Sequence, residues 1–252
     1  MGKLLRFELR KILRSKAFYV CVAISIGFLI LTLVTAKVAN DALEAIGQPT
    51  LTLSGVFFAK SAISNASIGM ISAIFIAIYV CEDFTSGTMK TIIAKGNDRT
   101  KVYFSKYIIS VSAVIIWSIL SVLVAFLIGT AMYGNNEALK DNVAVIIIGQ
   151  LLGVLAYHSL YFMISYSFTK VGASIALNLL GPLGVNLLLN FGDTLIKSDS
   201  FKLTDYWIDG IVGNFTASTT NNKLIISGMI LLVVYCAATA IGGWLIARRK
   251  EI

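Results

Sequence analysis

Long apolar blocks that contain no Asp, Glu, Lys or Arg alternate with short polar segments along the chain. The blocks cover residues 17–36, 61–81, 107–133, 143–169, 171–192 and 224–247. Each has 20 or more residues, and roughly 20 are needed to cross the ~30 Å hydrocarbon core of a bilayer as a helix. A spanning segment must satisfy its backbone hydrogen bonds internally. The pattern therefore predicts an all-α polytopic protein with six transmembrane helices in a single domain, residues 1–252.

The first 16 residues have the period of an amphipathic helix. Its apolar residues recur at helical spacing: Leu5, Leu9, Ile12 and Leu13. Its arginines line a different face: Arg6, Arg10 and Arg14. We expect this helix to lie along the inner membrane surface before the first span. The alternative is that these basic residues only mark the inner side of the membrane.

A second short helix is predicted on the outer side, between the fifth and sixth spans. Its apolar residues are Trp207, Ile208, Ile211, Val212 and Phe215, with Thr204 and Asp205 before them as possible caps. We expect this helix to be half sunk at the outer membrane interface.

Charge predicts the orientation. Of the 21 Lys and Arg residues, 15 fall on the side that holds both termini and the segment 82–106. Cytoplasmic segments carry this excess, so both termini are predicted in the cytoplasm. The formal net charge of +8 fits contact with anionic lipid head groups and requires no nucleic acid.

Sequence patterns of common enzymes are absent. The chain has no P-loop, no G-x-S-x-G nucleophile elbow and no H-E-x-x-H zinc pattern, and it has one histidine. We therefore expect no catalytic residue, no bound metal and no cofactor. The six blocks also lack the ionisable groups that gradient-driven carriers place at membrane depth, so the driving force is expected to come from a separate subunit.

Mildly polar residues form stripes on two of the spans. The second span carries Ser61, Asn65, Gly69 and Ser72, and the fifth carries Asn178, Asn186 and Asn190. Such stripes either pack helices closely or line a polar path, and the sequence leaves both open. Gly181-Pro182 should also kink the fifth span.

His158 lies near the middle of the fourth span among tyrosines and serines. It is either a neutral histidine hydrogen-bonded inside the bundle or a residue that contacts substrate or senses pH.

The polar segment between the second and third spans contains one more amphipathic pattern. Met89, Ile92 and Ile93 share a face, between Ser86-Gly87 and Gly96-Asn97, and Asp98 is a plausible cap for the following helix. We expect a short cytoplasmic helix that exposes apolar side chains. An exposed apolar patch rimmed by charge is typical of a docking surface, and the docked partner is expected to be a separate ATPase.

This segment resembles a known signature, "E, then S-G-T, then R, then G-K". The matching residues are Glu82, Ser86-Gly87-Thr88, Lys90, Arg99 and Lys106. The signature follows the second span in permease subunits of type 2 ATP-binding-cassette exporters, in the branch linked to bacitracin, lantibiotic and other antimicrobial-peptide export or immunity. Two positions depart from it: Ser105-Lys106 replaces Gly-Lys, and Gly96-Asn97-Asp98 replaces a frequent Pro-Ser.

The resemblance implies specific roles. The segment from Glu82 to Ala94 would be a coupling helix seated in a groove of the ATPase, with Arg99 nearby. Glu82 would brace it against the N-terminal helix through a residue such as Arg10 or Arg14, unless Glu82 simply faces solvent. The first, second and fifth spans of two permease copies, identical or paralogous, would frame a conduit. ATP and Mg²⁺ would bind to two copies of the ATPase. The resemblance also implies that the protein lies in a bacterial cytoplasmic membrane.

The expected function is ATP-driven export of an amphipathic substrate such as an antimicrobial peptide, toxin or drug. One alternative is a non-transporting immunity or scaffold protein that binds a peptide at the outer Trp207–Phe215 segment. Another is an intramembrane enzyme that depends on His158.

Overall fold

The computed structural model describes residues 1–48, 53–63, 66–134, 143–196, 201–216 and 222–250. Every regular element in these ranges is helical. The elements are α1 (Gly2–Arg14), α2 (Lys16–Ala45), α3 (Gly55–Ala62), α4 (Ala66–Thr85), α5 (Thr88–Ala94), α6 (Arg99–Tyr133), α7 (Val143–Ser167), α8 (Val171–Ile196), the 3₁₀ turn η1 (Leu203–Tyr206), α9 (Ile208–Thr216) and α10 (Asn222–Arg249). Six of them, α2, α4, α6, α7, α8 and α10, are long and apolar enough to cross a membrane. The all-α multi-pass fold is therefore confirmed.

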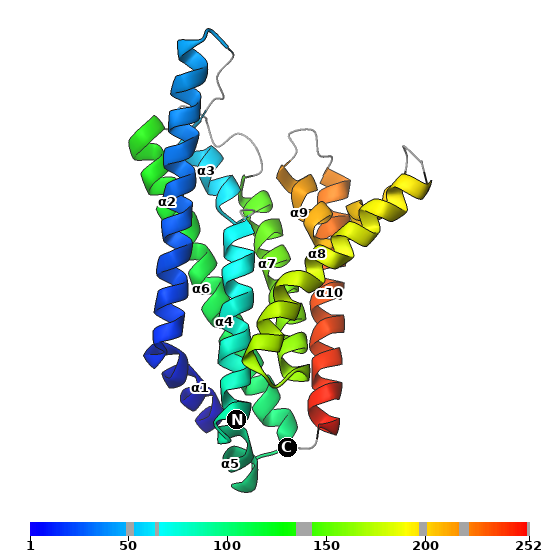
Figure 1. Ribbon diagram of the computed structural model, residues 1–252. Helices are drawn as coiled ribbons and strands as arrows, with labels where there is room; N and C mark the ends of the chain where they lie inside the picture. Colours follow the sequence, from blue (N-terminus) through cyan, green and yellow to red (C-terminus); the bar gives the residue numbers. More distant parts are fainter. Residues whose placement is uncertain (49–52, 64–65, 135–142, 197–200, 217–221, 251–252) are drawn as a thin grey trace.

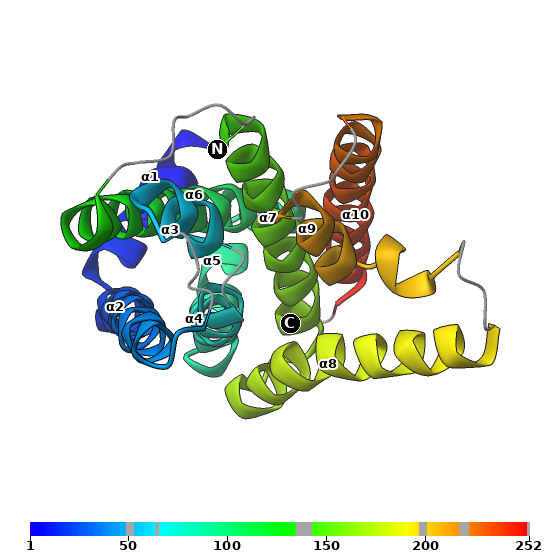
Figure 2. The ribbon, with the colours of Figure 1, turned by 90° about the horizontal axis from the view of Figure 1, so that it is seen from above.

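Helix α4, called here the central helix, is the most buried of the six candidate spans and lies between α2 and α8 in Figure 2. It packs against α2, α7 and α8. Of its most apolar 18-residue window, 61% is buried, compared with 11% for α10. Figure 1 places α1, α5 and the end of α10 at one end of the bundle, called here the α5 end, and α3 and α9 toward the other, the α9 end.

The N-terminal amphipathic helix is confirmed as α1. Ser15 separates it from α2, where the Phe18 amide donates to the Ser15 hydroxyl at 3.4 Å. Ile12 is buried against the bundle, whereas Leu9 and Leu13 are exposed. The three arginines of α1 are also exposed. An exposed apolar edge beside basic residues is typical of a helix that lies on a bilayer surface.

The predicted second span is two helices, α3 and α4. Helix α3 packs closely on α6, because Gly55 and Gly129 have no Cβ: one added at Gly55 would lie 2.1 Å from the Thr130 hydroxyl oxygen. Ser61 therefore belongs to α3, whereas Gly69 and Ser72 belong to α4. Asn65 lies outside the described residues.

Most of the polar segment 82–106 is helical. Helix α4 continues to Thr85, α5 covers Thr88–Ala94 and α6 begins at Arg99. The Asp98 side chain accepts a hydrogen bond from the Thr100 amide at 3.2 Å, so the predicted cap is confirmed.

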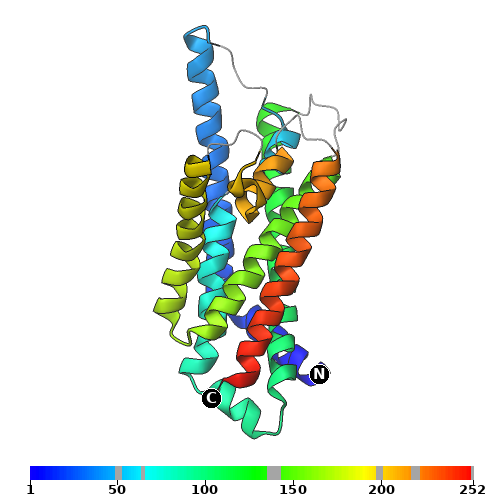
Figure 3. The same ribbon diagram turned by 90° about the vertical axis from the view of Figure 1, so that its right-hand side faces the viewer.

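The predicted outer helix is confirmed as α9, but its apolar face packs into the protein rather than into a membrane interface. Ile208, Ile211 and Phe215 are all less than 5% exposed and contact α7 and α10. Figure 3 shows α9 beside these two helices. Thr204 and Asp205 do not cap α9, because they lie in η1, where the Thr204 hydroxyl donates to Asp193 at 2.7 Å.

Glycines make room for α9. A Cβ at Gly149 of α7 would lie 2.8 Å from the Phe215 ring, and one at Gly153 would lie 2.3 Å from a Val212 methyl group. Both distances are shorter than any ordinary carbon contact.

Helix α8 contains Pro182 and changes direction along its length, so that its C-terminal half slants away from the bundle (Figure 1). The kink expected from Gly181-Pro182 is therefore present. A proline removes one backbone hydrogen bond and its ring displaces the preceding turn.

Candidate functional site

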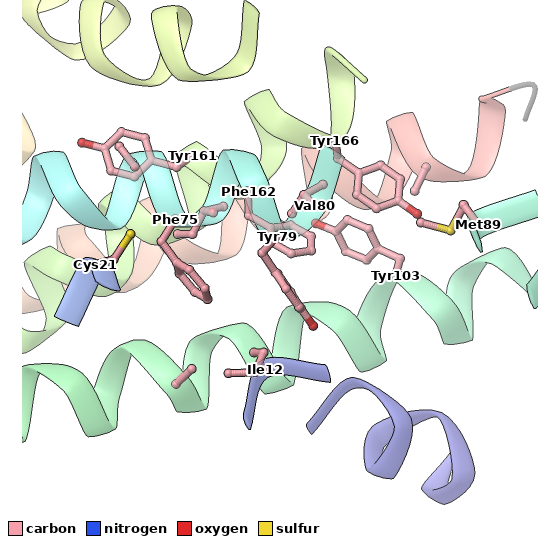
Figure 4. Close-up of a cluster of buried hydrophobic side chains, with 14 of the residues drawn as sticks. Ile12, Cys21, Phe75, Tyr79, Val80, Met89, Tyr103, Tyr161, Phe162 and Tyr166 are labelled. Atoms are coloured by element: carbon pink, nitrogen blue, oxygen red, sulfur yellow. The ribbon is translucent and has the colours of Figure 1, made fainter. Parts of the chain in front are cut away.

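Helix α5 is anchored in the core by its apolar face. Met89 is 0% exposed and Ile92 is 9% exposed. They belong to a buried cluster that includes Tyr103 and Tyr166, and Figure 4 shows Met89 beside these two rings. The expectation that α5 exposes apolar side chains is therefore wrong, because the core extends beneath the helix and covers Met89 and Ile92.

Both ends of α5 are held by local hydrogen bonding. Gly87 precedes it with φ of 71°, a left-handed conformation that favours glycine. The Ser86 and Thr88 hydroxyls contact each other at 2.8 Å. After the helix, the Asn97 side-chain amide donates to the Ile92 carbonyl at 2.9 Å. The S-G-T part of the signature thus forms the tight turn from α4 into α5.

The outward face of this region is polar. The exposed charged residues of segment 82–101 are Glu82, Lys90, Lys95, Asp98 and Lys101, and we call them the α5 surface. Three of the five are lysines and two are acids. A partner that docks on α5 therefore meets a charged surface with a small excess of positive charge.

A buried cluster of charges joins α1 to α4 and α6 at the same end. The Lys106 ammonium of α6 donates to Glu8 of α1 at 3.2 Å and also to Asp83 of α4. The Lys11 ammonium of α1 donates to the second oxygen of Asp83. The Tyr79 hydroxyl donates to Glu8 at 2.6 Å. We call these five residues the α1 ion cluster.

The α1 ion cluster is shielded from solvent and carries no net formal charge. The side chains of Glu8, Asp83 and Lys106 are at most 2% exposed, and that of Lys11 is 21% exposed. The Lys106 nitrogen also lies 4.3 Å from the centre of the Tyr79 ring. Burial and the neighbouring Lys106 ammonium lower the pKa of Lys11, and the Asp83 carboxylate opposes this effect.

The predicted brace between the N-terminal helix and the segment after the second span exists, but through different residues. Among the described residues no ion pair joins Glu82 to Arg10 or Arg14, so the predicted pairing is wrong. All three side chains are exposed, which agrees with the alternative that Glu82 faces solvent. Asp83, one residue later, points into the bundle and pairs with Lys11. In a helix, neighbouring residues point in directions about 100° apart, so that only one of the two acids can face α1.

The buried ion pair of Glu8 could have been predicted from the sequence. It is the acidic residue of a helix that otherwise carries basic charges, and it lies four residues before Ile12, on the buried side. A lone acid on the apolar side of a basic helix indicates a buried cation partner.

Arg99 and Lys250 tie the start of α6 to the end of the chain. The Arg99 guanidinium donates to the Lys250 carbonyl at 2.6 Å. The Lys250 ammonium donates to the carbonyls of Tyr166 and Ser167, at 2.6 and 2.8 Å, where α7 ends. Burial lowers the pKa of Lys250. Arg99 therefore has a structural partner within the chain.

The residues predicted for a conduit do not form one line. Gly69 and Ser72 of α4 and Asn178 of α8 line the same cavity between α4, α7, α8 and α9. Asn186 instead donates to Asp209 at 3.1 Å, and Asn190 donates to the Asn186 carbonyl at 2.8 Å. Gly69, Ser72 and Asn178 thus line a cavity, whereas Asn186 and Asn190 do not.

His158 is 0% exposed. Its Nε2 lies 3.0 Å from the Ser110 hydroxyl of α6, and the Tyr107 and Phe162 rings flank it. This position agrees with the interpretation of a histidine hydrogen-bonded inside the bundle.

Sequence comparison assigns the chain to a family. The model of the family described as "Protein of unknown function (DUF2705)" matches residues 42–252. The chain belongs to this family. The match begins near the end of α2, so that it includes Asp83 and Lys106 of the α1 ion cluster but not Glu8 and Lys11. No curated protein matches the chain.

Proposed function

We propose that this protein is the permease subunit of an ATP-driven exporter of amphipathic compounds, energised by a separate ATPase at the α5 end. In this proposal the α5 end faces the cytoplasm. The leading substrate class is an antimicrobial peptide, a toxin or a drug.

One observation carries this proposal: α5 lies at the end of the bundle yet is fixed to its centre. Met89 and Ile92 insert into the core, and the turn at Gly87 joins α5 directly to α4. Helix α4 in turn packs against α2, α7 and α8. A force applied to α5 would therefore act on the central helix without being absorbed by a flexible loop.

The α1 ion cluster extends this connection to the surface helix. Displacing α4 alone would separate Asp83 from Lys106 and Lys11, and leave buried charges unpaired. Breaking a buried pair in this way costs about 3–5 kcal/mol. We therefore expect α1, α4, α5 and the start of α6 to move as one unit when the ATPase closes, which is a rigid-body transition.

The docking contact is charged. The lysines of the α5 surface, Lys90, Lys95 and Lys101, call for an acidic groove on the ATPase, since complementary charge steers association and fixes register.

The test is capture of the partner. The tagged chain, expressed in its native cells and purified in mild detergent, should retain an ATPase subunit and raise its rate of ATP hydrolysis. Reconstituted alone in liposomes, with only an ion gradient, the chain should transport nothing. Transport in the absence of any ATPase would disprove the proposal.

A non-transporting immunity protein that binds a peptide at the outer helix receives less support. The apolar residues of α9 that would hold the peptide, Ile208, Ile211 and Phe215, are buried against α7 and α10.

A further inference from the structure

A cavity of about 160 Å³ lies between α4, α7, α8 and α9. Pro182 and Val212 contribute to its apolar wall, and Met70 and Leu183, each about half exposed, mark its opening. A cavity of ~150 Å³ holds a molecule the size of benzene. There is room for one ring or for a short alkyl chain with a head group.

Two buried amide side chains on this cavity have unused hydrogen-bonding capacity. Gln150 is 0% exposed, and neither its Oε1 nor its Nε2 has a hydrogen-bond partner among the described residues. Asn178 is also 0% exposed, and its Oδ1 is likewise unpaired in the described part of the chain. Its Nδ2, in contrast, donates to the Ala73 carbonyl at 3.1 Å and to the Ser165 hydroxyl at 3.0 Å.

Unpaired buried amides are costly. Leaving a buried polar group unsatisfied costs about 1–3 kcal/mol, and native structures satisfy the great majority of such groups. The backbone and side chains around Gln150 leave it facing a space large enough for a ligand. The missing partner is therefore expected inside the cavity.

The charge of the residues that line the cavity indicates the charge of that ligand. Asp209, in the first turn of α9, supplies the one formal charge among the described residues that line the cavity. Asn186 donates to one of its carboxylate oxygens at 3.1 Å, which orients the carboxylate.

Two aromatic rings add to this preference. Tyr157 and Tyr161 both line the cavity and stack on each other with ring centroids 5.6 Å apart. The faces of aromatic rings attract cations.

The Asp209 carboxylate and the Gln150 amide oxygen accept N–H or O–H donors. The Gln150 amide nitrogen and the Tyr157 hydroxyl, which also have no partner in the described part of the chain, can donate. The carboxylate is the group among these that carries a charge, so it favours a cationic donor. A primary ammonium supplies three donors and a positive charge in one small group. An alcohol lacks the charge, and a quaternary ammonium lacks the donors.

We infer that this cavity is a binding site for a primary ammonium group carried on an apolar body. The ammonium pairs with the exposed Asp209 carboxylate beside Gln150, and the apolar part fills the space toward Met70 and Leu183. Binding of such an amine does not depend on the proposed transport function. That the amine belongs to the exported compound does rest on the proposed function.

The test measures equilibrium binding to the purified full chain in nanodiscs, without any ATPase, by isothermal titration calorimetry. The probe is 2-phenylethylammonium. The matched probes are the neutral 2-phenylethanol, the anion 3-phenylpropanoate and the trimethylated ammonium. We expect one site for the primary amine, and at least tenfold weaker binding of the other three probes.

Three variants locate the site. Asp209→Asn keeps the size of the side chain and an oxygen for Asn186, and Gln150→Leu keeps most of the volume of its side chain. Each should weaken binding of the amine at least tenfold. Asp205→Asn removes an exposed carboxylate from η1, outside the cavity lining, and should leave binding unchanged.

The proposal is overturned if the wild type does not bind the amine, if it binds 2-phenylethanol as tightly, or if Asp209→Asn binds like the wild type. Because no ATPase or nucleotide is present, a failure to bind is distinguishable from a failure of transport. Gel filtration and circular dichroism of each variant separate loss of the site from loss of the fold.

Discussion

Lys106 and Glu8 are 98 residues apart in the chain, and their charged atoms lie 3.2 Å apart with both side chains buried. Lys106 also pairs with Asp83, so that one ammonium holds the surface helix α1 and the central helix α4 against α6. Lys106, the last residue of the exporter-like signature, thus pairs with both carboxylates of the α1 ion cluster.

Replacing Lys106 should destabilise the protein strongly. Lys106→Met leaves the Glu8 and Asp83 carboxylates buried with one fewer cation, and breaking a buried pair typically costs about 3–5 kcal/mol. We expect a clear drop in the melting temperature in detergent. Lys101→Met, which changes an exposed lysine of the same helix, should melt like the wild type. Equal melting of both variants would show that the cluster contributes nothing to stability.

Reversing charge on the α5 surface should prevent docking without affecting the fold. Lys90 and Lys95 are exposed, so Lys90→Glu combined with Lys95→Glu should repel an acidic groove. We predict loss of the ATPase in co-purification and an unchanged melting temperature. The control is Lys202→Glu, at an exposed lysine near the α9 end. Retention of the ATPase by the double variant would argue against docking at α5.

The apolar face of α5 should contribute to the stability of the fold. Met89→Ala removes a side chain that is 0% exposed, and such core truncations cost about 2–5 kcal/mol. Thr91→Ala changes an exposed position of the same helix and should be nearly neutral. Thermal melting of the two variants compares them directly. If Met89→Ala instead keeps full stability and loses only the ATPase, then Met89 faces the partner and not the core.

Gln150→Leu should make the protein more stable while weakening amine binding. Leucine removes two buried amide atoms that have no partner among the described residues, each of which costs about 1–3 kcal/mol when unsatisfied. A rise in melting temperature together with weaker binding is typical of a functional site that is not optimised for stability. A lower melting temperature would mean that Gln150 already has its partners in the free protein.

Adding one methyl group at Gly149 should disturb α9. The Cβ of Gly149→Ala would lie 2.8 Å from the Phe215 ring, so α9 must shift, whereas Gly27→Ala in α2 has no heavy atom within 4 Å. Overpacking of this kind typically costs about 1–3 kcal/mol, while alanine at an open helical position is neutral or stabilising. The difference in melting temperature between the two variants checks the packing of α9, and equal values would contradict it.

The helices themselves could be predicted from the sequence. Uninterrupted apolar blocks identify spans because their backbone must bond internally, and short-range signals located α5, α9, the Asp98 cap and the kink at Pro182. These features depend on residues within about one helical turn of each other.

What the sequence could not show was which way a short helix faces. Periodicity identifies Met89 and Ile92 as sharing a face, but the aromatic rings that cover them, Tyr103 and Tyr166, come from α6 and α7. The packing of α3 on α6 likewise depends on a close approach of Gly55 to Gly129. The α1 ion cluster was missed for the same reason, because its pairs join residues 23 to 98 positions apart.

Because α4 contacts both the cavity and the α1 ion cluster, binding at the cavity should be coupled to binding at the α5 end. One uninterrupted stretch of α4 carries Ser72 on the cavity and Asp83 in the α1 ion cluster, about 17 Å apart along the axis at 1.5 Å per residue. An amine that binds more tightly to one position of α4 must change the affinity of α5 for the ATPase. Linkage then requires that the ATPase change the affinity for the amine by the same factor.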